Sequence, residues 1–381
     1  MDVGLGLDAS LGMSFEDQTT LSREAAELGY TSLWTPEGVG VDSFQLSLMR
    51  WQATLDVVPG GLTTGISVSN VAYRGPAAFA ISAGTLGAIT GGRFILGIGS
   101  GRTYSAATRR SVGLGGGSAL TIMREYLQTT RALLAGETVD FAGETVTLHG
   151  VQLAIQPPPR TPVYVAALGP EMLRIAGECA DGAALNWCSA EQVAWSRARI
   201  AEGAARAGRD PAAVRMAEYI RVCVDDDVAT ARRGLARATV SYALGQSVPT
   251  ERERRFGYRA HFERMGFSPQ LAELDAMRAR GLSGNELLDA FPDEILNAVG
   301  YFGPAEGAAE AFARLAQGLD TAVVRVVAAR PGLDAVRAVM RACRPERVAA
   351  DPPPCGPRHM ARTVPSRAPR CATMRRIAGC S

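Results

Sequence analysis

The segment GGRFILGIGSGRTY, residues 91–104, contains a short apolar strand that runs directly into Gly97, Gly99 and Gly101. Glycines at a strand end indicate a tight turn or something lying flat against the backbone. A dinucleotide-binding fingerprint is excluded because the spacing is G-x-G-x-G and the residues about 20 positions further on, ALTIM, contain no acid. The segment therefore indicates one strand end within a larger fold.

Outward from this segment, apolar strand-like runs alternate with helix-length amphipathic stretches. The strand-like runs are 3–7, 31–37, 62–70, 93–99, 161–168, 181–187, 214–224 and 321–329. Eight strand–helix units in about 340 residues predict an α/β fold, a (β/α)8 TIM barrel with insertions. A doubly wound sheet is the alternative, since periodicity does not distinguish closed from open parallel sheets.

Two segments interrupt the alternation and are expected to be insertions, at about 137–160 and 245–290. The first alternates like a hairpin with a turn at Ala142-Gly143, and the second is polar, Arg-rich and expected to be partly helical. After Cys343 the chain is rich in Pro and Arg and has no period. We therefore expect one barrel domain, 1–343, and a disordered C-terminal tail, 344–381.

Composition excludes several kinds of chemistry. The chain has no lysine, so all 40 basic residues are arginine, which excludes P-loop, Schiff-base and pyridoxal chemistry. The three histidines are never spaced as a ligand pair, and the seven cysteines are scattered without a CxxC motif. Neither a metal centre nor a disulfide framework is predicted.

Charge and hydropathy argue against nucleic-acid and membrane partners. The tail carries a surplus of six positive charges, and removing it from the net charge of +2 leaves −4 for residues 1–343. This leaves no basic face for nucleic acid. Because no apolar run reaches membrane-spanning length and the N-terminus lacks a basic flank, we expect a cytoplasmic protein without membrane contact.

In a TIM barrel, functional residues lie at the C-terminal ends of the strands. This rule selects Asp8, Trp34 to Gly38, Ser67 to Asn70, Gly97 to Tyr104, Ala167 to Glu171, Asn186 to Cys188, Glu218 to Arg221, and Arg330. Two of these strand ends are lined with glycine, and the AALGPEM segment (166–172) also opens a helix, whose N-terminus suits an anion. Two such ends on one rim would suit a long planar cofactor with a phosphate tail.

Three segments carry a family resemblance: GGRFILGIGSG, PVYVAALGPEMLRIAGECADGAALNW and TTGISVSNVAYRGPAAFAISAGTLGAITGGR. They resemble the bacterial luciferase-like superfamily, and most closely its branch that uses the deazaflavin coenzyme F420. That branch includes methylene-tetrahydromethanopterin reductase and glucose-6-phosphate dehydrogenase of actinobacterial type. The resemblance covers about residues 1–343 and is strongest over 62–187.

The resemblance implies a set of cofactor contacts. Ser67-Val68 matches a non-proline cis peptide whose bulge backs the cofactor ring, with Asn70 at the same strand end. Gly99, Ser100 and Gly101 match the loop beside the ring, and the stretch Ala167, Leu168, Gly169 and Pro170 matches the phosphate-side loop. Glu37 matches an acidic position that contacts the polar edge of the ring in relatives.

Two departures limit the substrate. Sugar-phosphate dehydrogenases of this branch have His and Glu where this chain has Gly38 and Arg102, and the phosphate-gripping lysines are missing. Glucose-6-phosphate oxidation is therefore not expected. Arg102 is instead a candidate for binding an anionic substrate or polarising a carbonyl, and Asp8, Trp34, Tyr104 and Trp187 are candidates for the substrate pocket.

These observations predict a coenzyme F420-dependent oxidoreductase that transfers hydride to or from a small organic substrate. An FMN-dependent monooxygenase of the same superfamily is the alternative, and a cofactor-binding barrel without catalysis is a third. The resemblance further implies a homodimer.

Overall fold

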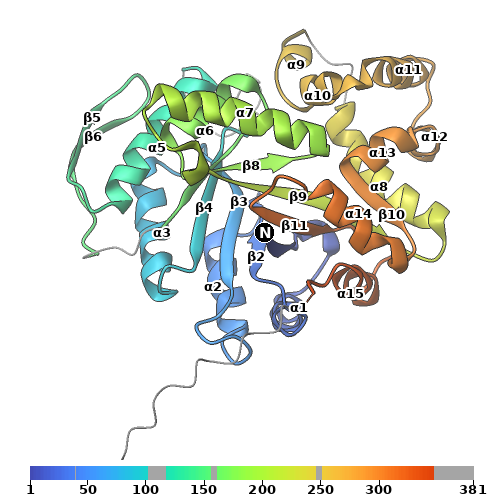
Figure 1. Cartoon of the computed structure of the whole chain (residues 1–381), viewed down its shortest axis with the longest axis horizontal. Coiled ribbons are helices and arrows are strands. Elements are labelled where there is room, and N and C mark those ends of the chain that lie inside the picture. Colours follow the sequence, from blue (N-terminus) through green and yellow to red (C-terminus); the bar gives the residue numbers. More distant parts are fainter. Residues whose placement is uncertain (39, 102–116, 156–160, 246–250, 347–381) are drawn as a thin grey trace, which may run out of the picture. The chain divides into compact units, whose positions relative to one another are not determined.

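The computed structural model describes residues 1–38, 40–101, 117–155, 161–245 and 251–346 (Figure 1). Eight parallel strands pair in a closed ring in which the last strand returns to the first. They are β1 (Asp2–Gly6), β2 (Ser32–Thr35), β3 (Thr63–Asn70), β4 (Phe94–Gly99), β7 (Val163–Ala166), β8 (Gly182–Asn186), β9 (Arg215–Val224) and β11 (Thr321–Val326). The closed sheet confirms the TIM barrel and excludes the doubly wound alternative.

Helices cover the outside of this barrel (Figure 1). They are α1 (Phe15–Glu27), α2 (Ser43–Ala53), α3 (Pro76–Ile89), α5 (Ala119–Leu134), α6 (Pro170–Cys179), α7 (Ala190–Arg206), α14 (Ala308–Leu315) and α15 (Leu333–Ala342). Short 3-10 turns lie at Ala9–Leu11, Pro211–Ala213 and Ala305–Gly307. In the described part of the chain, no helix has the length and apolar character needed to cross a membrane.

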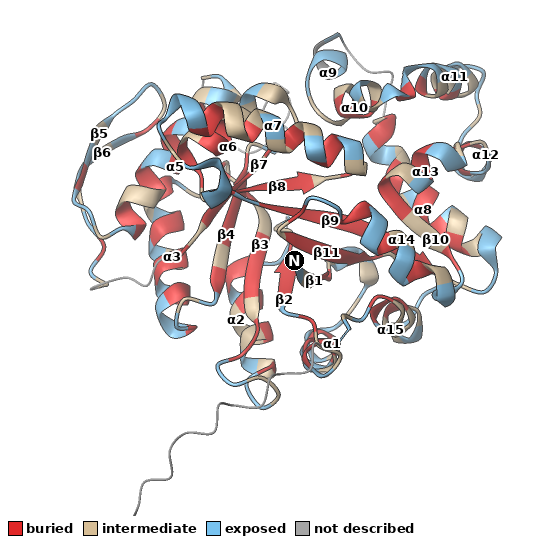
Figure 2. Ribbon diagram, viewed as in Figure 1, coloured by how far each residue is buried: buried red, intermediate tan, exposed pale blue. Residues whose placement is uncertain are grey.

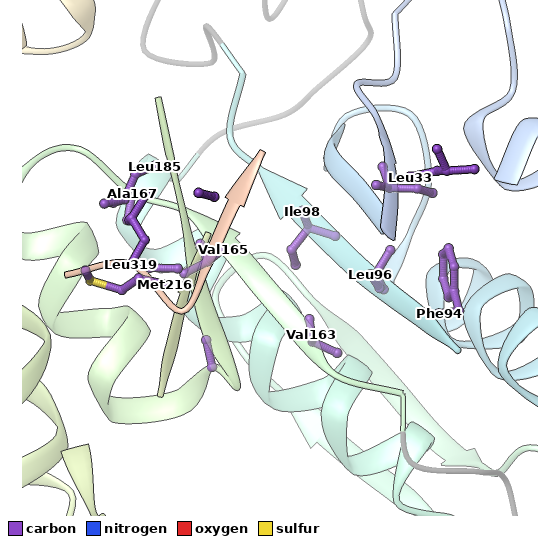
Figure 3. Packing of buried hydrophobic residues seen from close by; sticks show 14 of the residues in the cluster. Leu33, Phe94, Leu96, Ile98, Val163, Val165, Ala167, Leu185, Met216 and Leu319 are labelled. Carbon is purple, nitrogen blue, oxygen red and sulfur yellow. The ribbon is translucent and has the colours of Figure 1, made fainter. Parts of the chain in front are cut away.

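The main core lies between the strands and these helices, and strand alternation decides which side chains enter it. Leu33 of β2, Leu96 and Ile98 of β4, and Val165 of β7 point outward from the barrel and pack under the helices (Figure 3). The β9 and β11 strands are buried along nearly their whole length (Figure 2).

Residues of the opposite alternation fill the barrel interior, and the largest of them is Trp34. Its indole is 1% exposed and lies 6.3 Å from the ring of Tyr164. A Cβ on Gly4 or Gly65, in the two neighbouring strands, would lie 2.8 or 2.5 Å from the indole. Glycine on both sides is therefore what lets one large ring occupy the interior.

The first interruption forms a hairpin in the connection between α5 and β7. It consists of β5 (Val139–Ala142) and β6 (Thr147–Val151), and Gly143 donates to the carbonyl of Val146 across the turn at 2.8 Å. Glu125 on α5 is 7% exposed and accepts hydrogen bonds from the backbone of residues 144–146 and from the Thr145 hydroxyl. The hairpin is thus fastened to the helical layer by one carboxylate.

The second interruption follows β9 and is larger. It contains α8 (Val228–Ala243), α9 (Glu251–Arg255), α10 (Tyr258–Phe262), a π-helical turn (Glu263–Phe267), α11 (Ser268–Ala279), α12 (Gly284–Asp289), α13 (Asp293–Val299) and β10 (Gly300–Gly303). These helices share a core of their own, separate from that of the barrel. The expected insertion at 245–290 falls within this longer excursion.

The β10 strand joins the excursion to the barrel sheet. Arg221 of β9 is the register partner of Gly300 in β10 and of Arg325 in β11, so β10 and β11 lie on opposite sides of β9. The pairing of β8 with β9 ends at Tyr219. The β10 strand therefore continues the sheet where β8 stops.

Candidate cofactor and substrate site

The β3 strand ends in a bulge that explains the glycines of β4. The Ser67–Val68 peptide bond is cis, as the resemblance implied, and the register with β4 shifts between Ile66 and Ser69. A Cβ on Gly97 would overlap the Ile66 carbonyl oxygen, and one on Gly99 would lie 2.7 Å from Val68 Cγ2. The two glycines are therefore required by the close approach of the bulge.

The two glycine-lined strand ends lie at the same end of the barrel, which we call the mouth. β4 and β7 are neighbours, and the Cβ position of Gly99 is 3.0 Å from the Cβ of Ala166. Gly101 adopts a φ of 55°, and a Cβ there would overlap the Asn70 amide. The segments 97–101 and 167–170 are thus brought together, with Ser100 between the glycines.

The start of α6 leaves open space in front of the backbone. Gly169 is the N-cap, Pro170 is the first helical residue, and no side chain caps the first turn. An added Cβ on Gly169 would meet no atom of the described residues within 4 Å. Ala167 donates to the Ala184 carbonyl at 3.2 Å, and the Leu168 carbonyl accepts from Arg264 at 3.0 Å, so the loop is held from two sides.

The carboxylate of Glu37 is buried and fully engaged. Its side chain is 3% exposed and pairs with Arg74 through both oxygens, at 2.6 and 2.8 Å. The hydroxyl of Ser69 and the amide of Ser43 also donate to it, while its own amide donates to the Val68 carbonyl at 3.3 Å. In this structure Glu37 holds the end of β3 in place, and Arg74 is a residue that sequence reasoning missed.

Asp8 lies at the end of β1 and forms an ion pair with Arg325 of β11. The guanidinium carbon of Arg325 lies 4.8 Å from the ring centroid of Tyr219, on β9. Sequence reasoning missed Arg325 and Tyr219, although Arg325 is the lone charged residue in the apolar run TAVVRVV. A charge in an otherwise buried strand was the signal that would have found it.

The two tryptophans expected in the substrate pocket occupy different environments. Trp34 lies in the barrel interior, with its Nε1 donating to Ser32 at 2.8 Å. Trp187 follows β8 with a φ of 60° and packs under the second excursion, 5.2 Å from Tyr242 and 6.4 Å from Phe262 between ring centroids. Of the two tryptophans, Trp187 is therefore the one that contacts the excursion.

Arg221 connects Trp187 to the strand ends. Its guanidinium carbon is 3.6 Å from the Trp187 ring centroid. It donates to the side-chain oxygen of Asn186, whose amide in turn donates to the Tyr258 hydroxyl at 2.7 Å. Asn186 and Arg221 both belong to strand ends that the barrel rule selected, and the structure brings them together.

Behind Trp187 lies a buried group of titratable residues. Burial raises the pKa of Glu218 to about 8, even though the Cys188 amide donates to its carboxyl at 2.6 Å. Burial also lowers the pKa of His261 to about 4, and its Nε2 lies 2.8 Å from the Trp187 carbonyl. Both groups are therefore mainly neutral at pH 7.

Two expected site residues, Arg102 and Tyr104, lie outside the described residues, as does 347–381 of the expected tail. Arg330, another strand-end residue, is exposed and pairs with Asp225 at 2.6 Å. Within the described ranges, no cluster of His, Cys, Asp or Glu is arranged to hold a metal ion.

Comparison with known proteins agrees with this geometry. Residues 2–322 match the family described as luciferase-like monooxygenase, and the chain belongs to that family. It is 29% identical over 308 residues to 5,10-methylenetetrahydromethanopterin reductase of Methanolobus tindarius, an alignment covering 81% of this chain and 88% of the reductase.

Solved structures share the fold. The coenzyme F420-dependent tetrahydromethanopterin reductase of Methanopyrus kandleri superposes with a TM-score of 0.69 at 20% identity, over 89% of this chain and 96% of that one. The oxygenating constituent of 3,6-diketocamphane monooxygenase from Pseudomonas putida, in complex with FMN, superposes with a TM-score of 0.60 at 16% identity, over 90% and 97%.

Proposed function

We propose that this protein is a coenzyme F420-dependent oxidoreductase that transfers hydride to or from a small organic substrate. Support comes from the similarity to a methylenetetrahydromethanopterin reductase along four-fifths of the chain. When bound, F420 supplies two-electron hydride chemistry at its deazaflavin ring. The protein's task is to hold that ring, orient the substrate and exclude water.

The observation that carries the proposal is a rim made of backbone. The Ser67–Val68 bulge, the Gly99–Gly101 segment and the open N-terminus of α6 meet at one mouth, and side chains are excluded from Gly99 by steric overlap. Such a rim suits close approach of a flat ring beside the β3 bulge, with an anionic tail at the start of α6. The residues present therefore fit the cofactor.

The polar groups of the rim favour hydride transfer over acid–base chemistry. Glu37 is engaged by Arg74, and Asp8 is engaged by Arg325. Glu218 is buried and its place on β9 alternates with the inward-facing Tyr219, so its side chain points out of the barrel interior. The described carboxylates at the mouth, Glu37 and Asp8, are therefore held in ion pairs that position neighbouring side chains.

Titration with F420 tests the proposal, because binding quenches the fluorescence of the cofactor. We expect the wild-type protein to quench it at micromolar concentration. Gly169→Val adds a side chain at a position where no other described residue lies within 4 Å of the added Cβ, so the variant should fold normally and weaken F420 binding at least tenfold.

A matched control is available at the start of α3. Gly75 is also an N-cap before a proline, with open space around its Cβ position. Gly75→Val should leave F420 affinity within twofold of wild type. The absence of quenching by the wild-type protein would contradict the proposal.

An FMN-dependent monooxygenase is the second candidate, favoured by the family's description and by the FMN-bound neighbour. Oxygen uptake with reduced FMN, together with no response to F420, would select it.

A further inference from the structure

Two arginines at the mouth carry more positive charge than the described carboxylates around them neutralise. Arg221 and Arg325 are register partners on β9 and β11, so their Cα atoms lie about 5 Å apart. They are 5% and 8% exposed, and both lie over the ring of Tyr219, at 6.0 and 4.8 Å from its centroid.

The partners of Arg221 are neutral. It donates to the Asn186 side chain and to the Tyr219 carbonyl at 3.0 Å, and it stacks on Trp187 at 3.6 Å. Among the described residues, no carboxylate lies within ion-pair distance of it. A buried cation is ordinarily paired with an anion because desolvation of an isolated charge is costly.

Only one of the two terminal nitrogens of Arg325 has a partner among the described residues. Its Nη2 pairs with Asp8, but its Nη1 is buried and has no hydrogen-bond partner within the described part of the structure. The hydroxyl of Tyr219 is also buried, and the side chain of Ser67 lies beside it. A buried donor without a partner is unfavourable, so Arg325 Nη1 is available to an acceptor brought by a ligand.

Other charged groups nearby do not compensate the pair. Glu218 lies between Tyr219 and Arg221 in sequence, but burial raises its pKa to about 8 and keeps it neutral at pH 7. Arg50 adds a further positive charge, and its two terminal nitrogens already meet neutral acceptors, among them the Leu7 carbonyl and Gln18, while its Nε has no partner among the described residues.

We propose that the substrate carries a carboxylate, and that Arg221 and Arg325 bind it at the mouth with the Tyr219 hydroxyl as a third donor. This inference rests on the proposed function, because it assigns a substrate class to that site. With Asp8 counted, the pair carries one uncompensated charge, which a monoanion neutralises. Planar guanidinium forks match a carboxylate, and the cover provided by Trp187 strengthens the attraction by excluding water.

Ligand binding to the wild-type protein tests the assignment without any variant. Benzoate, its neutral analogue benzamide and inorganic phosphate are titrated at constant ionic strength while tryptophan fluorescence is recorded. We expect a saturable benzoate response at least tenfold tighter than that of benzamide or phosphate. Trp187→Phe should remove most of the signal, since Arg221 stacks on that ring. Equal responses, no saturable response, or binding of phosphate alone would overturn the proposal.

Variants then locate the binding. Arg221→Gln should weaken benzoate at least tenfold and Arg221→Lys less, while F420 affinity changes less than twofold. Arg330→Gln, at an exposed arginine of the same region, is the control and should change neither. Unchanged benzoate affinity in a folded Arg221→Gln variant would contradict the assignment. If that variant does not fold, the difference between benzoate, benzamide and phosphate binding to the wild-type protein decides. Failure of F420 binding with an intact benzoate contrast overturns only the proposed cofactor.

Discussion

The two excursions from the barrel differ in the kind of connection they occupy. The β5–β6 hairpin lies in a helix-to-strand connection and packs on the helical layer, with Leu153 lying near α3. The α8–β10 excursion lies in the connection that follows β9 and brings Tyr258 and His261 to the strand ends. In Figure 1 the hairpin stands beside α5, away from the helices α9–α12.

This difference shows how a barrel separates stability from function. Strand-to-helix connections meet at the mouth, whereas helix-to-strand connections meet at the opposite end. The hairpin is fastened by an ionised carboxylate, Glu125, while the other excursion surrounds neutral buried groups, Glu218 and His261. Changes in the two regions should therefore have separable consequences.

The largest expected effect is that of Phe262→Ala, in α10. Phe262 is fully buried and lies 6.4 Å from Trp187 between ring centroids. Loss of a buried phenyl ring lowers the free energy of unfolding by about 3–5 kcal/mol. Denaturant unfolding measures this change.

Phe256→Ala is the matched control, because Phe256 precedes α10 and is 48% exposed. Its effect should stay within about 0.5 kcal/mol. Equal effects of the two substitutions would show that the excursion does not pack as described.

Glu125→Ala comes next and probes the hairpin. The substitution leaves the backbone amides of Glu144, Thr145 and Val146 without their acceptor. We expect a loss of about 3 kcal/mol in unfolding free energy, with F420 affinity unchanged.

Glu137→Gln, an exposed site at the start of the same hairpin, is the control and should have little effect. A loss of cofactor affinity in Glu125→Ala, measured by fluorescence quenching on folded protein, would break the separation between the two excursions.

The smallest expected effect, taken per unit of pH, is a pH dependence at Glu218. Its carboxyl titrates near 4.5 in the unfolded chain and near 8 in the fold because of burial. The unfolded state therefore binds fewer protons between these values, and wild-type stability falls as pH rises through this window. Glu218→Gln removes that fall, so its stability relative to wild type should rise by roughly 1 kcal/mol per pH unit up to pH 8.

Glu125→Gln provides the contrast, because Glu125 titrates in the opposite sense. Burial alone would raise the pKa of Glu125, but hydrogen bonds from residues 144–146 outweigh burial and lower it. Its stabilisation is complete above about pH 5 and is lost in acid, so its difference from wild type should be flat between pH 5 and 8. If the stability of Glu218→Gln relative to wild type also stays constant between pH 5 and 8, the two carboxyl groups do not differ in the way proposed.

Much of the architecture was readable from the sequence. The eight apolar runs gave the barrel, because alternation of strands and helices is a local pattern, and Glu37, Asn186 and Arg221 all fell at predicted strand ends. The different positions of Trp34 and Trp187 were not readable. Strand parity sends the first into the barrel interior, and a left-handed φ turns the second toward helices that are distant in sequence.

The ion pairs of the site were also beyond sequence reasoning. Glu37 and Arg74, or Asp8 and Arg325, are joined only when strands close into a ring, and nothing in their spacing indicates the pairing. The contacts of residues 245–290 with the strand ends could not be predicted either, because they too form only when the strands close into a ring.

The pairing of β10 with β9 has a consequence for motion. Because β10 pairs with residues Arg221 to Val224 of β9, main-chain hydrogen bonds attach the excursion that contains α8–α13 to the barrel sheet. These helices cannot move away from the barrel as a rigid lid unless the hydrogen bonds between β10 and β9 break. Amide protons of β10 should therefore exchange with solvent as slowly as those of the barrel strands.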